Sequence, residues 1–238
     1  MSMFRRNVAQ HGDALELLRS LPEACSPLVW IDPEFREHLD KMKYGNEGKS
    51  RQKARAMLPP MTTEYIDAIC RESIRTLRPS GYLARWIDPF GLCTSKHLRV
   101  VDETCQVVDL IAWDNLHMGM GHRSRRRGDY LVVYQKPPIK AKSTWLDHGI
   151  PDRWSEKVDR KIHPHVKPFG LIKRVIAAVT QVDDLVIDPA AGSFVVMHAA
   201  HQLDREFIGC DLIMPECTPE LPATKNPQLD SFEMGAHA

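Results

Sequence analysis

Short apolar runs alternate with longer amphipathic segments along most of the chain, and this pattern predicts strands and helices in turn. Such an alternation is typical of an α/β fold with a mostly parallel sheet and helices on both faces. The irregular, basic stretch between the fourth and fifth runs predicts that these two strands pair antiparallel at one edge of the sheet. The seven expected strands are residues 7–13, 27–32, 79–88, 106–114, 129–137, 184–189 and 206–211.

Four segments between these runs have the apolar spacing of amphipathic helices. One of them is expected to begin at Thr62 or Thr63, because threonine is a favourable N-cap residue. Another has Pro168 at its start, where the missing amide of proline removes no helical hydrogen bond. The predicted helices are residues 14–23, 62–77, 168–180 and 193–203.

Several predicted strands end in an acid, as the runs "LVWIDPEF", "GYLARWIDPFG" and "LVIDPAAGSF" show. Ligands of open parallel sheets bind beyond the carboxyl ends of the strands, so these acids are expected to gather on one rim around a binding site. The alternative is that each acid caps the helix that follows it, as acids often do at such turns. The acids in question are Asp13, Asp32, Asp88, Asp188 and Asp211.

Length and composition fit one domain, expected over residues 1–212. The net charge of +1 indicates no particular partner, but residues 213–238 carry four acids, one lysine and four prolines, which predicts a mobile tail. The six cysteines are scattered and favour free thiols in a reducing compartment. Because no apolar run approaches the roughly 20 residues of a membrane span and no signal peptide opens the chain, the sequence predicts a cytoplasmic location.

Several segments, in their order along the chain, resemble the S-adenosylmethionine-dependent DNA amino-methyltransferases, which methylate adenine N6 or cytosine N4. The resemblance runs from Asn7 to Leu212 and follows the permuted arrangement in which the catalytic motif precedes the cofactor motif. It implies a circularly permuted class I methyltransferase fold, which is Rossmann-like, and S-adenosylmethionine as cofactor. The segments are "GDALELLRSLP" leading into "IDPEF", then "TLRPSGYL", "RRRGDYLVVYQKP", "HPHVKPFGLIKRVI", "LVIDPAAGS" and "REFIGCDL".

The resemblance also implies a cofactor site. Gly192 and Ser193, in the turn that follows Asp188 and Ala190, would hold the methionine part of the cofactor. A glycine there lets the backbone come close to a ligand where a Cβ would intrude. Asp211 ends the next strand and is placed to accept hydrogen bonds from both ribose hydroxyls, as acids in dinucleotide folds do.

Two further cofactor contacts are implied by the resemblance alone. Asp13 would end the strand beside the cofactor and meet the adenine amino group. Lys167, in the segment "HVKP", is the candidate for binding the cofactor carboxylate. The alternative for Lys167 is a surface lysine in front of a helix.

The turn "DPEF" is the expected catalytic turn. An exocyclic amine of adenine or cytosine is a poor nucleophile, because its lone pair is delocalised into the ring. Two acceptors directed at the amine hydrogens favour sp³-like geometry and free that lone pair. Asp32 offers a carboxylate and Pro33 its carbonyl, with the proline ring fixing the turn. Phe35 offers a face on which a base rotated out of the duplex can stack.

Glu34 departs from the family pattern, which has a second proline at this position. Three interpretations compete: an altered base preference, since an acceptor suits an amino donor such as that of cytosine; a carboxylate turned towards a nearby arginine; or a damaged catalyst. Because the family pairs an initial Asp with adenine N6, the expected activity is adenine-N6 methylation of DNA. Cytosine-N4 methylation and a catalytically weakened DNA-binding module with the cofactor fold are the alternatives.

Two basic segments are expected to contact DNA. Residues 36–61 hold seven lysines and arginines against three acids and could close on phosphates and the extruded nucleotide, unless they form a solvated basic helix. In "HRSRRRGD" the arginines suit phosphates or guanine edges, although Arg127 could instead pair with an acid of the rim. The predicted DNA-binding residues are Lys43, Lys49, Arg51, Lys53, Arg123, Arg125 and Arg126.

A short segment, residues 137–162, takes the place where sequence-specific relatives insert a recognition region. Its size predicts a short target sequence or relaxed specificity. Trp145 and Trp154 in this insert could stack on bases or pack in the core. The expected partner is double-stranded DNA, and the sequence leaves a monomer or a homodimer open.

Overall fold

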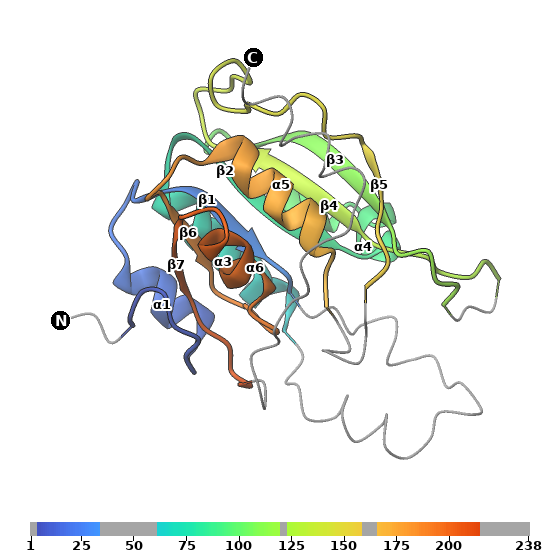
Figure 1. Ribbon diagram of the computed structural model, residues 1–238, viewed down its shortest axis with the longest axis horizontal. Helices are drawn as coiled ribbons and strands as arrows, with labels where there is room; N and C mark the ends of the chain where they lie inside the picture. Colours follow the sequence, from blue (N-terminus) through green and yellow to red (C-terminus); the bar gives the residue numbers. More distant parts are fainter. Residues whose placement is uncertain (1–3, 34–60, 120–122, 159–165, 215–238) are drawn as a thin grey trace.

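The computed structural model describes residues 4–33, 61–119, 123–158 and 166–214, which form a seven-stranded sheet between two layers of helices (Figure 1). The strand order is β5-β3-β4-β2-β1-β6-β7. The strands run parallel except β4, which is antiparallel to both β2 and β3. The strands are β1 (Ser26–Ile31), β2 (Leu77–Ile87), β3 (Gln106–Asp114), β4 (Tyr130–Gln135), β5 (Arg153–Ser155), β6 (Leu185–Asp188) and β7 (Glu206–Gly209).

Helices cover both faces of the sheet, as the alternating pattern predicts. On one face α5 (Phe169–Val179) and α6 (Val195–His201) pack on a core that includes Trp30, Trp86 and Phe207. On the other face α1 (Ala14–Ser20) and α3 (Thr63–Thr76) pack on the alternate side chains of the same strands. Two short elements, α4 (Pro89–Cys93) and the 3₁₀ helix η1 (Lys96–Val100), connect β2 to β3.

Caps explain where several helices begin. Thr62 caps α3 by accepting a hydrogen bond from the Tyr65 amide over 3.1 Å, and α5 begins directly after Pro168, so both predicted starts are confirmed. Asp13 caps α1, and Asp88 caps α4 by accepting from the Gly91 amide over 2.7 Å. The capping alternative therefore holds for Asp13 and Asp88.

The strand predicted over residues 7–13 is wrong. This segment contributes an isolated bridge between His11 and Asp211, and it contacts β7 through both backbone and side chains: the Asn7 amide donates to the Phe207 carbonyl over 2.8 Å. Asn7 has φ +61°, and its side-chain oxygen accepts from the Phe207 amide over 2.8 Å. The Gln10 side chain donates to the Gly209 carbonyl over 3.1 Å. Scattered backbone bonds and side-chain amides thus hold the segment beside β7 without the continuous ladder of a strand.

The seventh strand is β5, which the sequence does not predict. Its three residues pair with β3 at the sheet edge, so the antiparallel pair of β3 and β4 lies one strand inside that edge. Trp154 of β5 is fully buried, and Trp145 packs against Tyr82 with ring centroids 5.5 Å apart. Both tryptophans of the insert are therefore engaged in packing. No helix in the described part of the chain is long and apolar enough to cross a membrane.

Candidate active site

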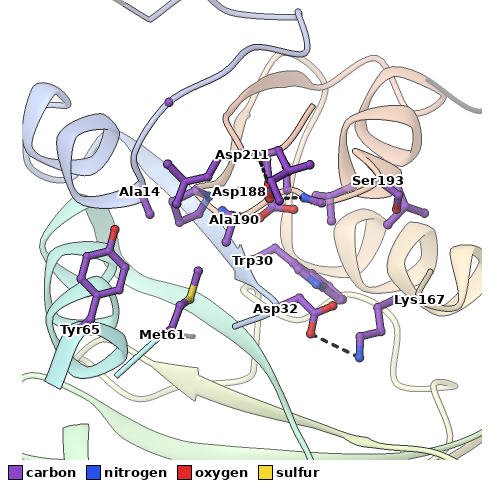
Figure 2. A pocket seen from close by; sticks show the side chains of 18 residues that line it. Ala14, Trp30, Asp32, Met61, Tyr65, Lys167, Asp188, Ala190, Ser193 and Asp211 are labelled. Atoms are coloured by element: carbon purple, nitrogen blue, oxygen red, sulfur yellow. Dashed lines mark hydrogen bonds and ion pairs between the residues drawn. The ribbon is translucent and has the colours of Figure 1, made fainter. Parts of the chain in front are cut away.

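A pocket lies at the carboxyl ends of β1, β6 and β7, beside the first turn of α3 (Figure 2). Three strand-end acids, Asp32, Asp188 and Asp211, line it together with Lys167. The sequence predicts one rim for five acids, and the structure brings these three together in the pocket, whereas Asp13 and Asp88 cap helices and are not part of its lining. The remaining wall is mostly apolar, with Trp30, Met61, Val195, Val196, Leu212 and Ile213.

Asp32 directly follows β1 and forms an ion pair with Lys167 (Figure 2). The Lys167 ammonium lies 3.3 Å from Oδ1 of Asp32 and 3.1 Å from Oδ2 of Asp129. This side chain is 13% exposed and lies 5.1 Å from the Trp86 ring. Burial alone would lower the pKa of Lys167, but the two carboxylates outweigh burial and raise that pKa above its ordinary value. The alternative of a surface lysine is therefore wrong.

Asp188 ends β6 and is 2% exposed. Within the described residues its carboxylate accepts a hydrogen bond from the Ala190 amide over 3.3 Å and has no cationic partner. Burial raises the pKa of Asp188 well above its ordinary value; the Ala190 amide lowers it, and the negative charges of Asp32 and Asp211 raise it again. An incoming positive charge would therefore find a favourable partner in this carboxyl group.

The cofactor-free protein is expected to lose stability as the pH rises through the raised pKa of Asp188. A carboxyl group with a higher pKa in the folded state stabilises the fold below its unfolded pKa and loses that contribution as it ionises. Each unit of pKa difference corresponds to about 1.4 kcal/mol. The unfolding temperature of the wild type, measured over a series of pH values, should fall as the pH rises. Asp188→Asn, which mimics the protonated group, should make this fall smaller.

The matched control is Asp109→Asn, because Asp109 is an exposed carboxyl group on β3. Its pH profile of unfolding should follow that of the wild type. An Asp188→Asn protein whose unfolding temperature declined with pH as steeply as the wild type would contradict the raised pKa of Asp188.

The turn after β6 is open at Gly192. This residue has φ +50°, and a Cβ placed on it would meet no atom within 4 Å. The Gly192 amide donates to Oδ2 of Asp211 over 2.8 Å, and Oδ1 of Asp211 accepts from the Ile213 amide over 2.8 Å. Asp211 thus fixes both the turn and the segment after β7. Ala190 and Ser193 line the pocket on either side of this turn.

Asp13 lies next to the pocket, but its neighbours Gly12 and Ala14 form the wall there. One carboxylate oxygen of Asp13 accepts from two amides in the first turn of α1. The other accepts from the Tyr65 hydroxyl over 2.5 Å, and burial together with this carboxylate raises the pKa of Tyr65. The contact of Asp13 with a cofactor adenine stays a prediction, and it requires Tyr65 to release the carboxylate.

Sequence reasoning missed several residues that line the pocket, and also Asp129, which pairs with the pocket residue Lys167. Trp30 could have been found, because a strand places residues two apart on the same face and Asp32 is two positions later. Asp129 could have been found too, because it directly precedes β4. Since β4 runs antiparallel to its neighbours, it begins at the rim where the parallel strands end. Met61 and Tyr65 come from the start of α3, and no motif marks them.

Part of the predicted site lies outside the described residues. Pro33 is described and buried, directly after Asp32. The roles of Glu34 and Phe35 stay predictions, and so does that of most of the basic segment 36–61. The predicted DNA-binding residues that lie outside the described ranges are Lys43, Lys49, Arg51 and Lys53.

The loop between β3 and β4 holds the other predicted DNA-binding residues. Arg126 forms an ion pair with Asp88, 3.1 Å apart, and lies over the Phe90 ring. The arginine that pairs with a predicted rim acid is therefore Arg126, and Arg127 instead pairs with Asp114, the last residue of β3, at 2.7 Å. Arg125 donates to the Gly119 carbonyl over 2.9 Å, and Arg123 is exposed.

The pocket residues fit S-adenosylmethionine, the cofactor expected from the sequence. This molecule combines a sulfonium and an ammonium cation with a carboxylate, a ribose diol and a flat base. Asp188 and Asp32 supply negative charge, and Asp211 supplies a carboxylate for a diol. Gly192 leaves the backbone approachable, and Ile213 belongs to an apolar wall against which a base can pack.

Comparison with known proteins points to one family. Residues 61–218 match the family N6_N4_Mtase, described as DNA methylase. Type II methyltransferase M.HhaII of Haemophilus parahaemolyticus is 46% identical over 202 residues, which cover 84% of this chain and 89% of that protein. DNA adenine methyltransferase YhdJ of Escherichia coli K12 is 44% identical over 242 aligned positions, covering 85% of this chain and 77% of that protein.

A solved structure supports the same fold. TTHA0409 of Thermus thermophilus is described as a putative DNA modification methylase in complex with S-adenosylmethionine. It superposes with a TM-score of 0.60 over 86% of this chain and 87% of its own chain, at 22% sequence identity. At this level of identity the similarity concerns the fold, which is that of the class I methyltransferases.

Proposed function

The chain belongs to the N6_N4_Mtase family of DNA methylases, and from this premise we propose that it transfers the methyl group of S-adenosylmethionine to N6 of adenine in double-stranded DNA. One observation carries the proposal. The carboxylate of Asp32 lies in the wall of a pocket that fits the cofactor, at the carboxyl end of a central strand, and an ammonium holds it there. The methyltransferase domain is proposed to span residues 1–212.

The cofactor is held by residues from three strand ends. Asp211 would receive the ribose hydroxyls, and Gly192 and Ser193, which line the same pocket, would hold the methionine part. Asp188 would face a positive charge of the cofactor, which would compensate the cost of burying its carboxylate. Lys167 is close enough to Asp32 to serve both the cofactor carboxylate and the catalytic acid. The bound cofactor supplies an electrophilic methyl group on a sulfonium.

Catalysis falls to the turn after β1. The Asp32 carboxylate and the Pro33 carbonyl accept hydrogen bonds from the target amine, which frees its lone pair for the methyl group. Asp32 is then placed to hold the proton that the amine releases. Asp129, 3.1 Å from the Lys167 ammonium, keeps that ammonium beside the Asp32 carboxylate, so the orientation of Asp32 is fixed before DNA arrives. Phe35 is proposed to stack on the extruded base.

Adenine is the proposed target base for two reasons. The name of YhdJ, which shares 44% of aligned positions with this chain, specifies adenine. The initial Asp of the catalytic turn is also the residue that the family pairs with adenine N6. Glu34 supports the alternative, cytosine N4, because an additional acceptor at this position suits an amino donor.

The labelled product identifies the target base. Purified protein is incubated with S-adenosylmethionine labelled in the methyl group and with unmethylated duplex DNA, and the digested DNA is separated into nucleosides. Label in N6-methyladenine is the expected result. Label in N4-methylcytosine would keep the mechanism and change the base. An absence of label, with cofactor and DNA both shown to bind, would contradict the proposed activity and favour a DNA-binding module that has lost catalysis.

A further inference from the structure

The loop from β3 to β4 leaves the sheet at the rim where the parallel strands β1, β6 and β7 also end, and it extends away from the sheet (Figure 1). Strand pairing places Ile31, Arg85, Val132 and Leu110 at one level across β1, β2, β4 and β3. Asp114, the last residue of β3, is therefore three residues further out than Asp32, or about 10 Å. The loop therefore extends further out than the end of β1, where Asp32 lies. Across the sheet, β3 is three strand spacings from β1, which is about 14 Å.

Two apolar side chains are displayed on this overhanging loop. Leu116 is 53% exposed and Met118 is 52% exposed. Leu116 also has φ +56°, a left-handed conformation that costs a side chain of this kind energy. Leucine thus occupies a position where asparagine or glycine would fit more easily, and its side chain gains little burial in return.

The loop is held in this conformation from several directions. Oδ1 of Asp114 accepts from the Leu116 amide over 2.9 Å, and Oδ1 of Asn115 accepts from the His117 amide over 2.9 Å. The Gly119 amide donates to the backbone carbonyl of Arg126 over 2.7 Å. The exposed leucine and methionine are therefore presented on a backbone that is already ordered.

The charges around these two side chains fit a polyanion. Arg123 and Arg125 are exposed on the same loop, and Arg126 is kept at its base by Asp88. Nucleic acid presents phosphates for such arginines and stacked bases for apolar side chains. Apolar residues such as leucine and methionine enter between base steps in proteins that unstack DNA.

Resting on the proposed function, we infer that Leu116 and Met118 enter the duplex beside the target base and support its extrusion towards Asp32. The dimensions agree: the overhang of about 10 Å matches a major groove that is about 8.5 Å deep. Leu116 and Met118 would fill the place that the extruded base leaves in the duplex. The pocket that receives the base lies to the side of them, at the lateral distance of about 14 Å. The loop arginines bind the flanking phosphates.

The test is a double variant, Leu116→Asn with Met118→Gln. Asparagine tolerates a positive φ, and both changes keep side-chain size while removing apolar character. The value of kcat/KM is measured on a fully paired duplex and on the same duplex with a mismatch at the target base, which lowers the cost of extrusion. We expect a loss of roughly ten- to a hundredfold on the paired duplex and recovery on the mismatched one.

Val182→Thr is the matched control, because Val182 is an exposed apolar residue before β6, at the opposite end of the sheet. It should behave as the wild type on both duplexes. A variant with full activity on the paired duplex, or with equal losses on both duplexes, would overturn the inference while the wild type still methylates DNA. A wild type that methylates no DNA would overturn the proposed function and this inference with it.

Discussion

Replacing Asp32 with alanine is expected to reduce methyl transfer by roughly a hundred- to a thousandfold, because the target amine loses the acceptor that frees its lone pair. The cofactor should still bind, since Asp188, Asp211 and Gly192 keep their places. The transfer rate of Asp32→Asn is expected to lie between those of the wild type and Asp32→Ala, because the asparagine oxygen still accepts one hydrogen bond but carries no charge.

The measurement is single-turnover transfer of labelled methyl to DNA, with cofactor affinity determined separately by calorimetry. Asp184→Ala serves as the control: this carboxylate forms an ion pair with Arg78 at the amino end of β6, away from the pocket. Transfer by the control should stay within about twofold of the wild type, as surface ion pairs contribute little. An Asp32→Ala protein with wild-type transfer would eliminate the proposed mechanism.

The sequence predicts those parts of the fold that apolar periodicity determines. The strands β1, β2, β4, β6 and β7 are largely buried runs, and β3 is an apolar run that is buried only towards its carboxyl end. The helices between them have clear stripes and caps. Prediction from apolar periodicity fails for β5, because one buried residue, Trp154, between two polar neighbours shows no repeating apolar pattern. The prediction fails also for residues 7–13, which lie beside β7 through scattered backbone bonds and the side chains of Asn7 and Gln10, without a continuous ladder.

The site residues likewise divide into those that the strand pattern places and those that it does not. Asp32, Asp188 and Asp211 follow parallel strands, so topology alone brings them to one rim. The ion pair of Lys167 with Asp32 and Asp129 depends on how the start of α5 meets the starts and ends of distant strands, which no local pattern encodes. Asp13 follows no strand, and its carboxylate serves a helix cap and Tyr65. Motif position therefore identifies a candidate, and packing decides its partners.

Asp211→Ala is expected to weaken S-adenosylmethionine binding by roughly ten- to a hundredfold, because hydrogen bonds to a charged group contribute about 1.5–3 kcal/mol. The carboxylate has two structural partners, the amides of Gly192 and Ile213, besides the ribose hydroxyls that we propose. The variant therefore loses the diol contact and also the anchor of the turn along the methionine part.

Calorimetric titration with S-adenosylmethionine tests this, with Glu206→Ala as the control at the other end of the same strand. Glu206 is a partly exposed acid that pairs with Arg6, so its removal should leave affinity unchanged. At saturating cofactor the Asp211→Ala protein should recover much of its transfer rate, because Asp32 is intact. A variant with normal affinity and a low rate at saturation would instead make Asp211 part of the catalytic step, and the ribose would need another acceptor.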